Sequence, residues 1–282
     1  MMPRWACDTR VIVGLSILFA VLVLALLAPL LVQSAPDEQD LLATLLPSAW
    51  AKGGEAAHPL GTDSLGRDVL ARLLYGTRLA LTVAAIAAPG AMIIGTIAAL
   101  LAGYFGGWVD WVIGRAVDVW MSFPPVILSL ILMVGLGTGS RNVILAIVLV
   151  DWTRFCRVLR AEVLVVVRRD YVTAARLVGF SHARVVLREV LPAVVPLLVT
   201  LLTLEMGIAV VVEAILAFVG LGVKPDEIAW GQMIADGRAT IYQAPINLLA
   251  PVAAIFVTVA GFNLLGDGLR RSLDLRLLEG RG

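Results

Sequence analysis

The chain has 282 residues, of which 60% are hydrophobic and 15% are charged, and its formal net charge is +1 at pH 7. Soluble domains are about 45–50% apolar and about 25% charged, so this chain has more apolar side chains than one soluble core buries. The composition therefore predicts a polytopic membrane protein, and it gives no support to nucleic-acid binding, which usually shows as a clustered basic surface.

Phosphate-binding and metal-binding motifs are missing from the sequence. Neither of the two lysines stands in a Gly-x-x-x-x-Gly-Lys-Ser/Thr loop, so a partner must hydrolyse ATP if ATP drives this protein. The spacing matches neither a zinc site nor a haem site for the cysteines and histidines of the chain, which are Cys7, Cys156, His58 and His182. We expect no metal site, no cofactor and no catalytic residue, and we expect both histidines to lie at the surface.

The first predicted element is a membrane-spanning helix at residues 11–32. Arg4 and Arg10 precede this apolar run, as basic residues also precede the core of a signal peptide. A signal-peptide core is about 7–15 residues long, whereas this run is long enough to cross a bilayer. We therefore expect an uncleaved first helix.

A polar stretch follows at residues 33–78. Asp63 and Arg67, and likewise Asp68 and Arg72, stand four residues apart, which favours an interfacial amphipathic helix over residues 61–78 with internal ion pairs. In the alternative interpretation, Asp63, Arg67 and Asp68 contact a substrate-delivery protein on the outer face. The sequence thus divides into a first helix with an outer amphipathic segment, residues 1–78, and a core of five further membrane helices, residues 79–282.

The five core helices are predicted at residues 79–103, 117–137, 142–158, 196–219 and 248–265. The first of them is rich in alanine and glycine, and small residues let helix backbones approach closely in lipid. We therefore expect this helix to be buried among others. The fold class that follows is an all-α membrane protein with six transmembrane helices.

The distribution of basic residues predicts the orientation. With the N-terminus inside, the inner segments contain fifteen of the 22 lysines and arginines, and the outer segments contain seven. Short inner loops are enriched in basic residues. We therefore expect a multi-pass protein with both its N-terminus and its C-terminus on the cytoplasmic side.

The loop between the fourth and fifth predicted helices has a pattern of its own. Residues 170–179 read as a short helix that ends at Gly179. The loop contains a high density of arginine, and its neutral interpretation is an interfacial segment anchored by arginine side chains.

Three acids fall within predicted membrane helices: Asp151, Glu205 and Glu213. Ionisable residues in such positions face a cavity or a partner. In one interpretation the three acids line a translocation path, where Glu205 and Glu213 meet an ammonium group or a cation. In the other, Asp151 pairs with Arg154 or Arg157, and the glutamates are satisfied at a subunit seam.

The arginine-rich loop resembles the EAA loop of permease subunits of bacterial ABC importers. The similarity lies in Thr173-Ala174-Ala175, Gly179 and Leu191-Pro192, although Thr173 stands where glutamate is usual and Glu189 where an aliphatic residue is usual. In that family the loop forms a cytoplasmic coupling helix that docks on the ATPase. The resemblance assigns docking to Asp170, Tyr171, Thr173, Ala174, Ala175, Arg176 and Gly179, and it implies the type I importer permease fold.

Five further motifs resemble the dipeptide/oligopeptide/nickel branch of this family, and its second permease subunit in particular. They are His58-Pro59-Leu60-Gly61-Thr62-Asp63-Ser64-Leu65-Gly66-Arg67-Asp68, Ser122-Phe123-Pro124, Phe218-Val219-Gly220-Leu221-Gly222, Trp230-Gly231-Gln232-Met233 and Phe262-Asn263-Leu264-Leu265-Gly266-Asp267-Gly268-Leu269-Arg270. The resemblance covers residues 10–276. It implies a bacterial inner-membrane protein that pairs with a related permease, two ATPase subunits and an extracytoplasmic binding protein.

The expected function is half of an ATP-driven path for dipeptides or oligopeptides. Nickel or a metal chelate is the alternative cargo, although the predicted core helices contain no histidine to bind a soft cation. An ion-coupled secondary carrier is a more remote alternative, because such carriers often contain internal repeats and none is visible.

Overall fold

The computed structural model describes residues 8–32, 34–224 and 226–279, with side chains up to Ser272 in the last helix. Arg4, Cys7 and Arg281 lie outside these ranges. Within them the chain is helical, and its only β-structure is an isolated bridge between Thr62 and Asp68. The helices are α1 (Thr9–Leu31), α2 (Val69–Phe105), α3 (Gly107–Met121), α4 (Pro125–Leu136), α5 (Ser140–Val166), α6 (Asp170–Leu177), α7 (His182–Val185), a π-helical turn (Val186–Val190), α8 (Leu191–Phe218), α9 (Trp230–Ala239) and α10 (Ile246–Glu279).

Four helices of the described chain are long and apolar enough to cross a membrane. They are α1, α2, the continuous helix 182–218 that contains α8, and α10 as far as Ser272. A fifth span results if α3 and α4 are counted together, although they meet at 87°. The structure thus supports a multi-pass helical protein, with fewer unambiguous spans than the six that the sequence predicts.

The predicted helix 117–137 is where the structure differs most from expectation. It is broken at Ser122–Pro124, and Pro125 begins α4 at a position where a missing N–H costs no helical hydrogen bond. The other predicted helices are longer in the structure than in the sequence pattern. α2 begins at Val69, so the expected division after residue 78 falls inside a continuous helix.

Close packing of α2 on α5 forms the centre of the bundle. A Cβ atom at Gly95 would lie 2.5 Å from both Phe155 Cβ and the carbonyl oxygen of Trp152, so only glycine allows this approach. Gly103 meets Val163 in the same way further along the pair. Most of the small residues of the predicted helix 79–103 are therefore buried, as the sequence indicated, although Ala85 is exposed.

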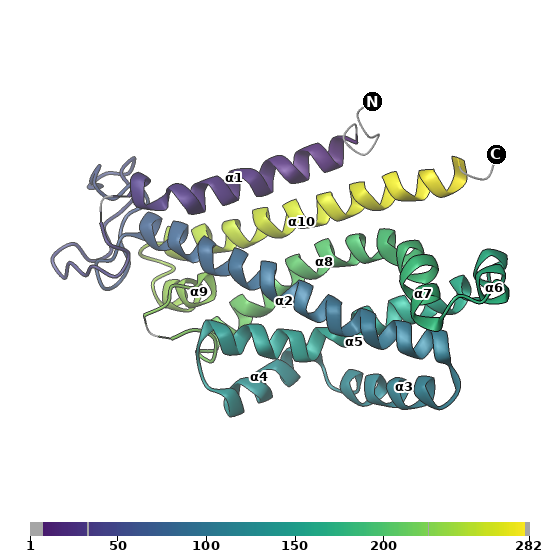
Figure 1. The fold of residues 1–282 in the computed structure, drawn as a ribbon. Helices are drawn as coiled ribbons and strands as arrows, with labels where there is room; N and C mark the ends of the chain where they lie inside the picture. The colour runs from purple at the N-terminus through teal and green to yellow at the C-terminus, as the bar shows by residue number, and fades with distance from the viewer. Residues whose placement is uncertain (1–7, 33, 225, 280–282) are drawn as a thin grey trace.

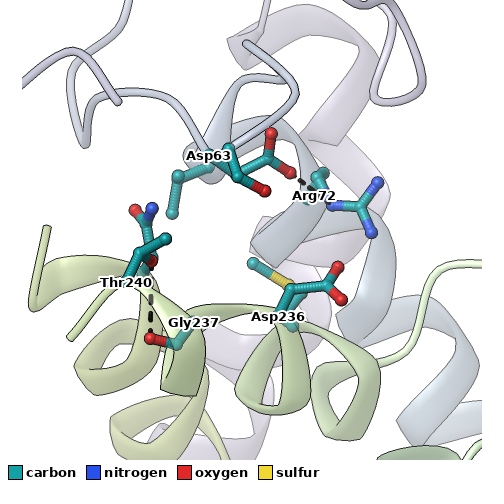
Figure 2. Close-up of a pocket in the computed structure, with 9 residues that line it drawn as sticks. Asp63, Arg72, Asp236, Gly237 and Thr240 are labelled. Atoms are coloured by element: carbon teal, nitrogen blue, oxygen red, sulfur yellow. Dashed lines mark hydrogen bonds and ion pairs between the residues drawn. The ribbon is translucent and has the colours of Figure 1, made fainter. Parts of the chain in front are cut away.

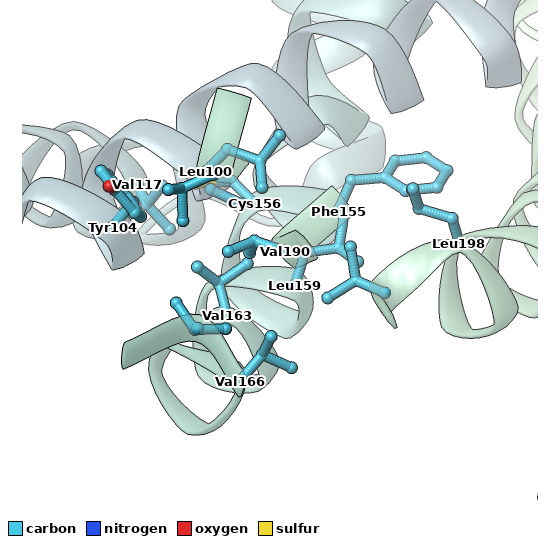
Figure 3. Packing of buried hydrophobic residues seen from close by; sticks show 14 of the residues in the cluster. Leu100, Tyr104, Val117, Phe155, Cys156, Leu159, Val163, Val166, Val190 and Leu198 are labelled. Carbon is cyan, nitrogen blue, oxygen red and sulfur yellow. The ribbon is translucent and has the colours of Figure 1, made fainter. Parts of the chain in front are cut away.

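An apolar cluster extends this packing to the segment between α5 and α8. Leu100 and Tyr104 of α2 contact the face of α5 that carries Phe155, Leu159 and Val163 (Figure 3). Val172, Val185 and Val190, which follow α5 in the chain, are fully buried in the same cluster. The segment 167–190 is consequently held against the bundle by its valines.

The elements gather at two ends of the bundle. Figure 1 shows that α1 begins and α10 ends on the same side as α6 and α7, while α9 and the segment 34–68 lie at the opposite end. We call these the α6 end and the α9 end.

The expected amphipathic helix over residues 61–78 is only partly present. Residues 61–68 form turns, in which Gly61 and Gly66 adopt positive φ angles of 82° and 72°. Asp63 accepts hydrogen bonds from the N–H groups of Leu65 and Arg67, which fixes a turn in place of a helix. Helical structure starts only after Asp68, whose carboxylate accepts from Ala71 N–H and caps α2.

Candidate functional site

The α6 helix is short and well delimited. Asp170 lies in its first turn and Arg176 in its last, which matches the helix dipole. After α6 the chain closes a Schellman motif: Gly179 N–H donates to Arg176 O, and Phe180 N–H donates to Ala175 O. Gly179 has φ +87°, a conformation that favours glycine. The predicted helix and its glycine stop are thus both present.

A polar contact fastens the segment around α6 to the end of α2. Tyr104 Oη lies 2.9 Å from His182 Nδ1, and the guanidinium of Arg176 lies 4.7 Å from the centre of the Tyr104 ring. His182 is at the surface as expected, yet it has this fixed partner. Tyr104 was not predicted, because 78 residues separate it from His182 and no local pattern connects them.

The outward surface of this segment, residues 168–188, is apolar and basic. Leu177 and Val178 are 84% and 76% exposed, and Leu187 is also exposed. Six of the predicted docking residues are exposed here and Ala175 partly so: Asp170, Tyr171, Thr173, Ala174, Arg176 and Gly179. Arg168, Arg169, Arg176, Arg184 and Arg188 have no carboxylate within 4.0 Å among the described residues. Such a surface is suited to contact with another protein.

Two of the three membrane acids share one arginine. Arg154 of α5 lies 3.3 Å from Glu205 of α8 and 3.9 Å from Asp151 on its own helix. Both carboxylates are buried, and Arg154 is partly exposed. The geometry agrees with the interpretation that Asp151 pairs with Arg154. It also joins the two helices that flank the α6 segment.

Glu213 differs from both of these acids. It is fully buried in α8, and neither of its carboxylate oxygens has a hydrogen-bond partner in the described structure. Its neighbours one turn away, Ala209, Ala217 and Leu216, are themselves buried and apolar. Glu213 therefore does not open onto a surface in this conformation.

At the α9 end, an ion-pair network surrounds a small cavity of about 10 Å³ (Figure 2). Asp63 lies 2.6 Å from Arg67 and 3.8 Å from Arg72, and Arg67 also pairs with Asp236 of α9 at 3.1 Å. Arg72 is only 3% exposed. Asp63 and Arg67 are thus paired as the sequence predicted, but Arg72 pairs with Asp63 and Asp37 and makes no pair with Asp68.

Asp68 has a different partner from the one expected. His58 Nδ1 lies 2.8 Å from Asp68, and His58 is half-buried, which corrects the expectation of a surface histidine. Most polar atoms of the three residues predicted to face a delivery protein therefore bind partners within the chain. Asp236, 169 residues from Arg67, was not predicted as part of this cluster.

The geometry described above agrees with comparisons to known proteins. Residues 91–279 match the family described as "Binding-protein-dependent transport system inner membrane component". The dipeptide transport system permease protein DppC of Alkalihalophilus pseudofirmus is 36% identical over 266 residues, which cover 94% of this chain and 86% of the relative.

Two further relatives transport different cargoes by name. The nickel transport system permease protein NikC of Escherichia coli K12 is 38% identical over 93% of this chain and 95% of its own. The glutathione transport system permease protein GsiD of Shigella dysenteriae is 40% identical over 80% of this chain and 74% of its own. The chain therefore belongs to the binding-protein-dependent inner membrane components of ABC importers, in the branch that contains the dipeptide and nickel permeases.

Proposed function

We propose that the chain is the permease subunit of an ATP-driven importer of dipeptides or oligopeptides, and that it forms half of the translocation path. The observation that carries this proposal is the exposed α6 segment between α5 and α8, which is anchored by valines inside and presents unpaired arginines outside. The relatives named for dipeptide and glutathione transport support peptides as cargo. In this role the chain performs no catalysis, and its contribution is conformational.

Six transmembrane spans fit this role best. α5 has 27 residues and is therefore about 40 Å long, enough for a bilayer core of about 30 Å. Two of its arginines have ion-pair partners within the protein, since Arg154 pairs with Glu205 and Arg160 with Asp110. We therefore count α5 as a span and α3 with α4 as one broken span, alongside α1, α2, α8 and α10.

An even number of spans agrees with the common position of the first and last helices at the α6 end (Figure 1). We propose that this end is cytoplasmic, because most basic residues lie there. The α9 end then faces outward. Residues 1–78 would form the first helix with the outer segment, and residues 79–282 the permease core, with α2 continuous across the division.

The partners follow from the two ends. We propose that Asp170, Tyr171, Thr173, Ala174, Ala175, Arg176 and Gly179 dock on one of two ATPase subunits. The outer segment held by Asp63, Arg67 and Asp68 would face the extracytoplasmic binding protein. A second, related permease would complete the path as a heterodimer, and α3 and α4, which expose many large apolar side chains, are available for it or for lipid.

Docking is tested by co-purification with the ATPase. Gly179→Val strains a backbone with positive φ, and Ala174→Leu adds bulk to the exposed face of α6, so both should reduce ATPase recovery strongly. Ala51→Leu, exposed at the opposite end, is the matched control. Full ATPase recovery with both α6 variants would reject the docking assignment.

The path assignment concerns Glu205, Glu213 and Asp151. Glu205→Gln and Glu213→Gln keep shape and remove charge, and we expect both to lower ATP-dependent peptide uptake in assembled transporters. Wild-type uptake by both would remove the path role and leave the ion pair with Arg154 as the function of Glu205.

Nickel is the second candidate cargo, because a nickel permease is as similar to this chain as the peptide permeases are. Proteoliposomes that contain the complete importer distinguish the two. ATP-dependent uptake of a labelled dipeptide, with no uptake of ⁶³Ni, supports the peptide assignment, and the reverse result replaces it.

A further inference from the structure

A second, larger groove lies at the α9 end. It has a volume of about 600 Å³, which is in the usual range for small-molecule sites. Its walls come from the first half of α2, the start of α5, the loop before α9, and Pro36 and Asp37 in the segment 34–68. Apolar side chains, Leu79, Ile86, Ile144 and Ile228, alternate in it with charged ones of both signs.

Arg78 supplies a fixed positive charge on one wall. Its Nε donates to Ala25 O at 2.7 Å, and its Nη2 lies 3.4 Å from Leu26 O. The Ala25 carbonyl is free to accept because Pro29, four residues later in α1, has no N–H. The guanidinium also lies 4.8 Å from the centre of the Tyr75 ring. These partners are all neutral, so Arg78 is held in place while its charge and three of its five N–H groups stay available.

Glu227 supplies a fixed negative charge on another wall. Its carboxylate accepts hydrogen bonds from Ser140 N–H, Ser140 Oγ–H and Lys224 N–H, at 3.1, 2.5 and 2.9 Å. Although burial acts to raise the pKa of Glu227, these hydrogen bonds hold it below its usual value, so the group is ionised at neutral pH. Its hydrogen-bond partners, like those of Arg78, are neutral groups, while the Lys224 ammonium helps to lower the pKa of Glu227 without forming an ion pair within 4.0 Å.

The two signs of charge do not cancel within the groove. No ion pair within 4.0 Å links Arg78 or Arg141 to Asp37, Asp226 or Glu227 in the described structure, and Arg141 and Asp226 are exposed nearby. Asp37, the third acid in the lining, pairs with Arg72 at 3.8 Å. A ligand with one positive and one negative end would satisfy both.

We propose that this groove binds a short peptide in its zwitterionic form, with the terminal carboxylate on Arg78 and the terminal ammonium on Glu227. The inference rests on the proposed function and adds to it an entry site on the outer side of the permease. The apolar walls would accept varied side chains, because they offer contact without directed hydrogen bonds.

Binding is measured on the purified pair of permeases in nanodiscs, without the binding protein, by saturation-transfer NMR. The probes are alanylalanine, its N-acetylated form and its C-terminal amide. We expect alanylalanine to bind about tenfold more tightly than either blocked form, since each block removes one charge-assisted hydrogen bond. Equal signals from all three probes would overturn the proposal.

Two variants should change this preference in opposite ways. Arg78→Gln should abolish the preference for a free carboxylate and keep that for a free amine, and Glu227→Gln should do the reverse. A general folding defect cannot produce this crossed pattern, and Arg78→Lys, which keeps the charge, should retain the carboxylate preference. Lys52→Gln and Glu55→Gln, exposed in the outer segment, are the matched controls. Equal losses for all probes in both variants would refute the assignment.

A zwitterionic lipid headgroup carries the same chemistry, and the discs distinguish it. Alanylalanine should bind equally in discs of phosphatidylglycerol and in discs that contain phosphatidylethanolamine. Loss of peptide binding in the second kind would assign the groove to lipid and reject the proposal. If the complete importer takes up peptide but the groove shows no preference among the three probes, this inference alone is rejected. If the importer takes up nickel in place of peptide, the proposed function is rejected.

Discussion

At the α9 end of the bundle, the half-buried Arg67 and the buried Arg72 are paired with aspartates, whereas at the α6 end five arginines have no carboxylate within 4.0 Å in the part of the chain that the structure describes. The first arrangement fastens the segment 34–68 to α2 and α9 by charge. In the second, apolar contacts of buried valines hold the segment, and its arginines form no ion pair within 4.0 Å among the described residues. The difference indicates that one end is stabilised internally, and it supports our proposal that the other end docks on a partner.

The largest expected effect comes from breaking the fastened end. Asp63→Ala removes the partner of two arginines, one of them almost fully buried, and we expect it to destabilise the fold by about 3–5 kcal/mol. Thermal unfolding and proteolysis of the outer segment measure this loss. Asp226→Ala, at an exposed aspartate without an ion pair, is the control. If the two variants melt alike, the network does not fasten the outer segment.

The packing of α2 on α5, which connects the two ends of the bundle, should give the next largest effect. Gly95→Leu would push α2 away from the α5 backbone, and overpacking of this kind typically costs about 1–3 kcal/mol. Gly135→Leu, where an added Cβ meets no atom within 4 Å, is the matched control in α4. Differential scanning fluorimetry in detergent is the measurement. An unchanged melting temperature for Gly95→Leu would mean that α2 and α5 do not pack as closely as described.

At the open end, a substitution should affect the partner more than the fold. Leu177→Ser removes an exposed apolar side chain, so its effect on unfolding should stay within about 0.5 kcal/mol. If the side chain is buried on docking, ATPase affinity should fall about tenfold. Surface plasmon resonance with the purified ATPase gives the affinity. A large loss of stability with unchanged affinity would reverse the contrast between the two ends.

The smallest expected effect is a pH dependence at the loop before α9. Because the pKa of Glu227 is lower in the folded chain than in the unfolded one, the group stabilises the fold above the unfolded pKa of about 4.3 and loses this contribution as pH falls below it. The melting temperature of wild type relative to Glu227→Gln should therefore be constant above about pH 5 and converge at lower pH. A difference that grows on acidification would show that the carboxylate has no favourable partners in the fold.

Features set by neighbouring residues could be predicted from the sequence. The helix Asp170–Leu177 and its stop at Gly179 depend on local hydrogen bonds and on one backbone conformation. The small residues around Gly95 indicated a buried helix, because close helix packing requires them wherever the partner lies. The membrane class followed from composition alone.

Features that join distant segments could not be predicted. The contacts Arg67–Asp236, Arg154–Glu205 and Tyr104–His182 span 169, 51 and 78 residues, and no spacing rule connects such pairs. The break between α3 and α4 was not predicted, because an apolar run indicates how long a hydrophobic segment is but not where the helix axis changes direction. Residues 61–68 were expected to be helical, but the turn made by Asp63 and two glycines outweighs their i,i+4 charge pattern.

The sequence by itself determined that the chain is a helical membrane protein with a short basic helix between two spans, because composition and local hydrogen bonding act over a few residues. Only the tertiary structure decided which charges are neutralised within the chain. Arg72 and Arg154 form ion pairs with carboxylates on other elements. Arg78 and Glu227 instead form hydrogen bonds with neutral groups, so no ion pair neutralises their charges. The physical reason is that an ion pair depends on distance in space, which the helix packing sets and the order of residues does not.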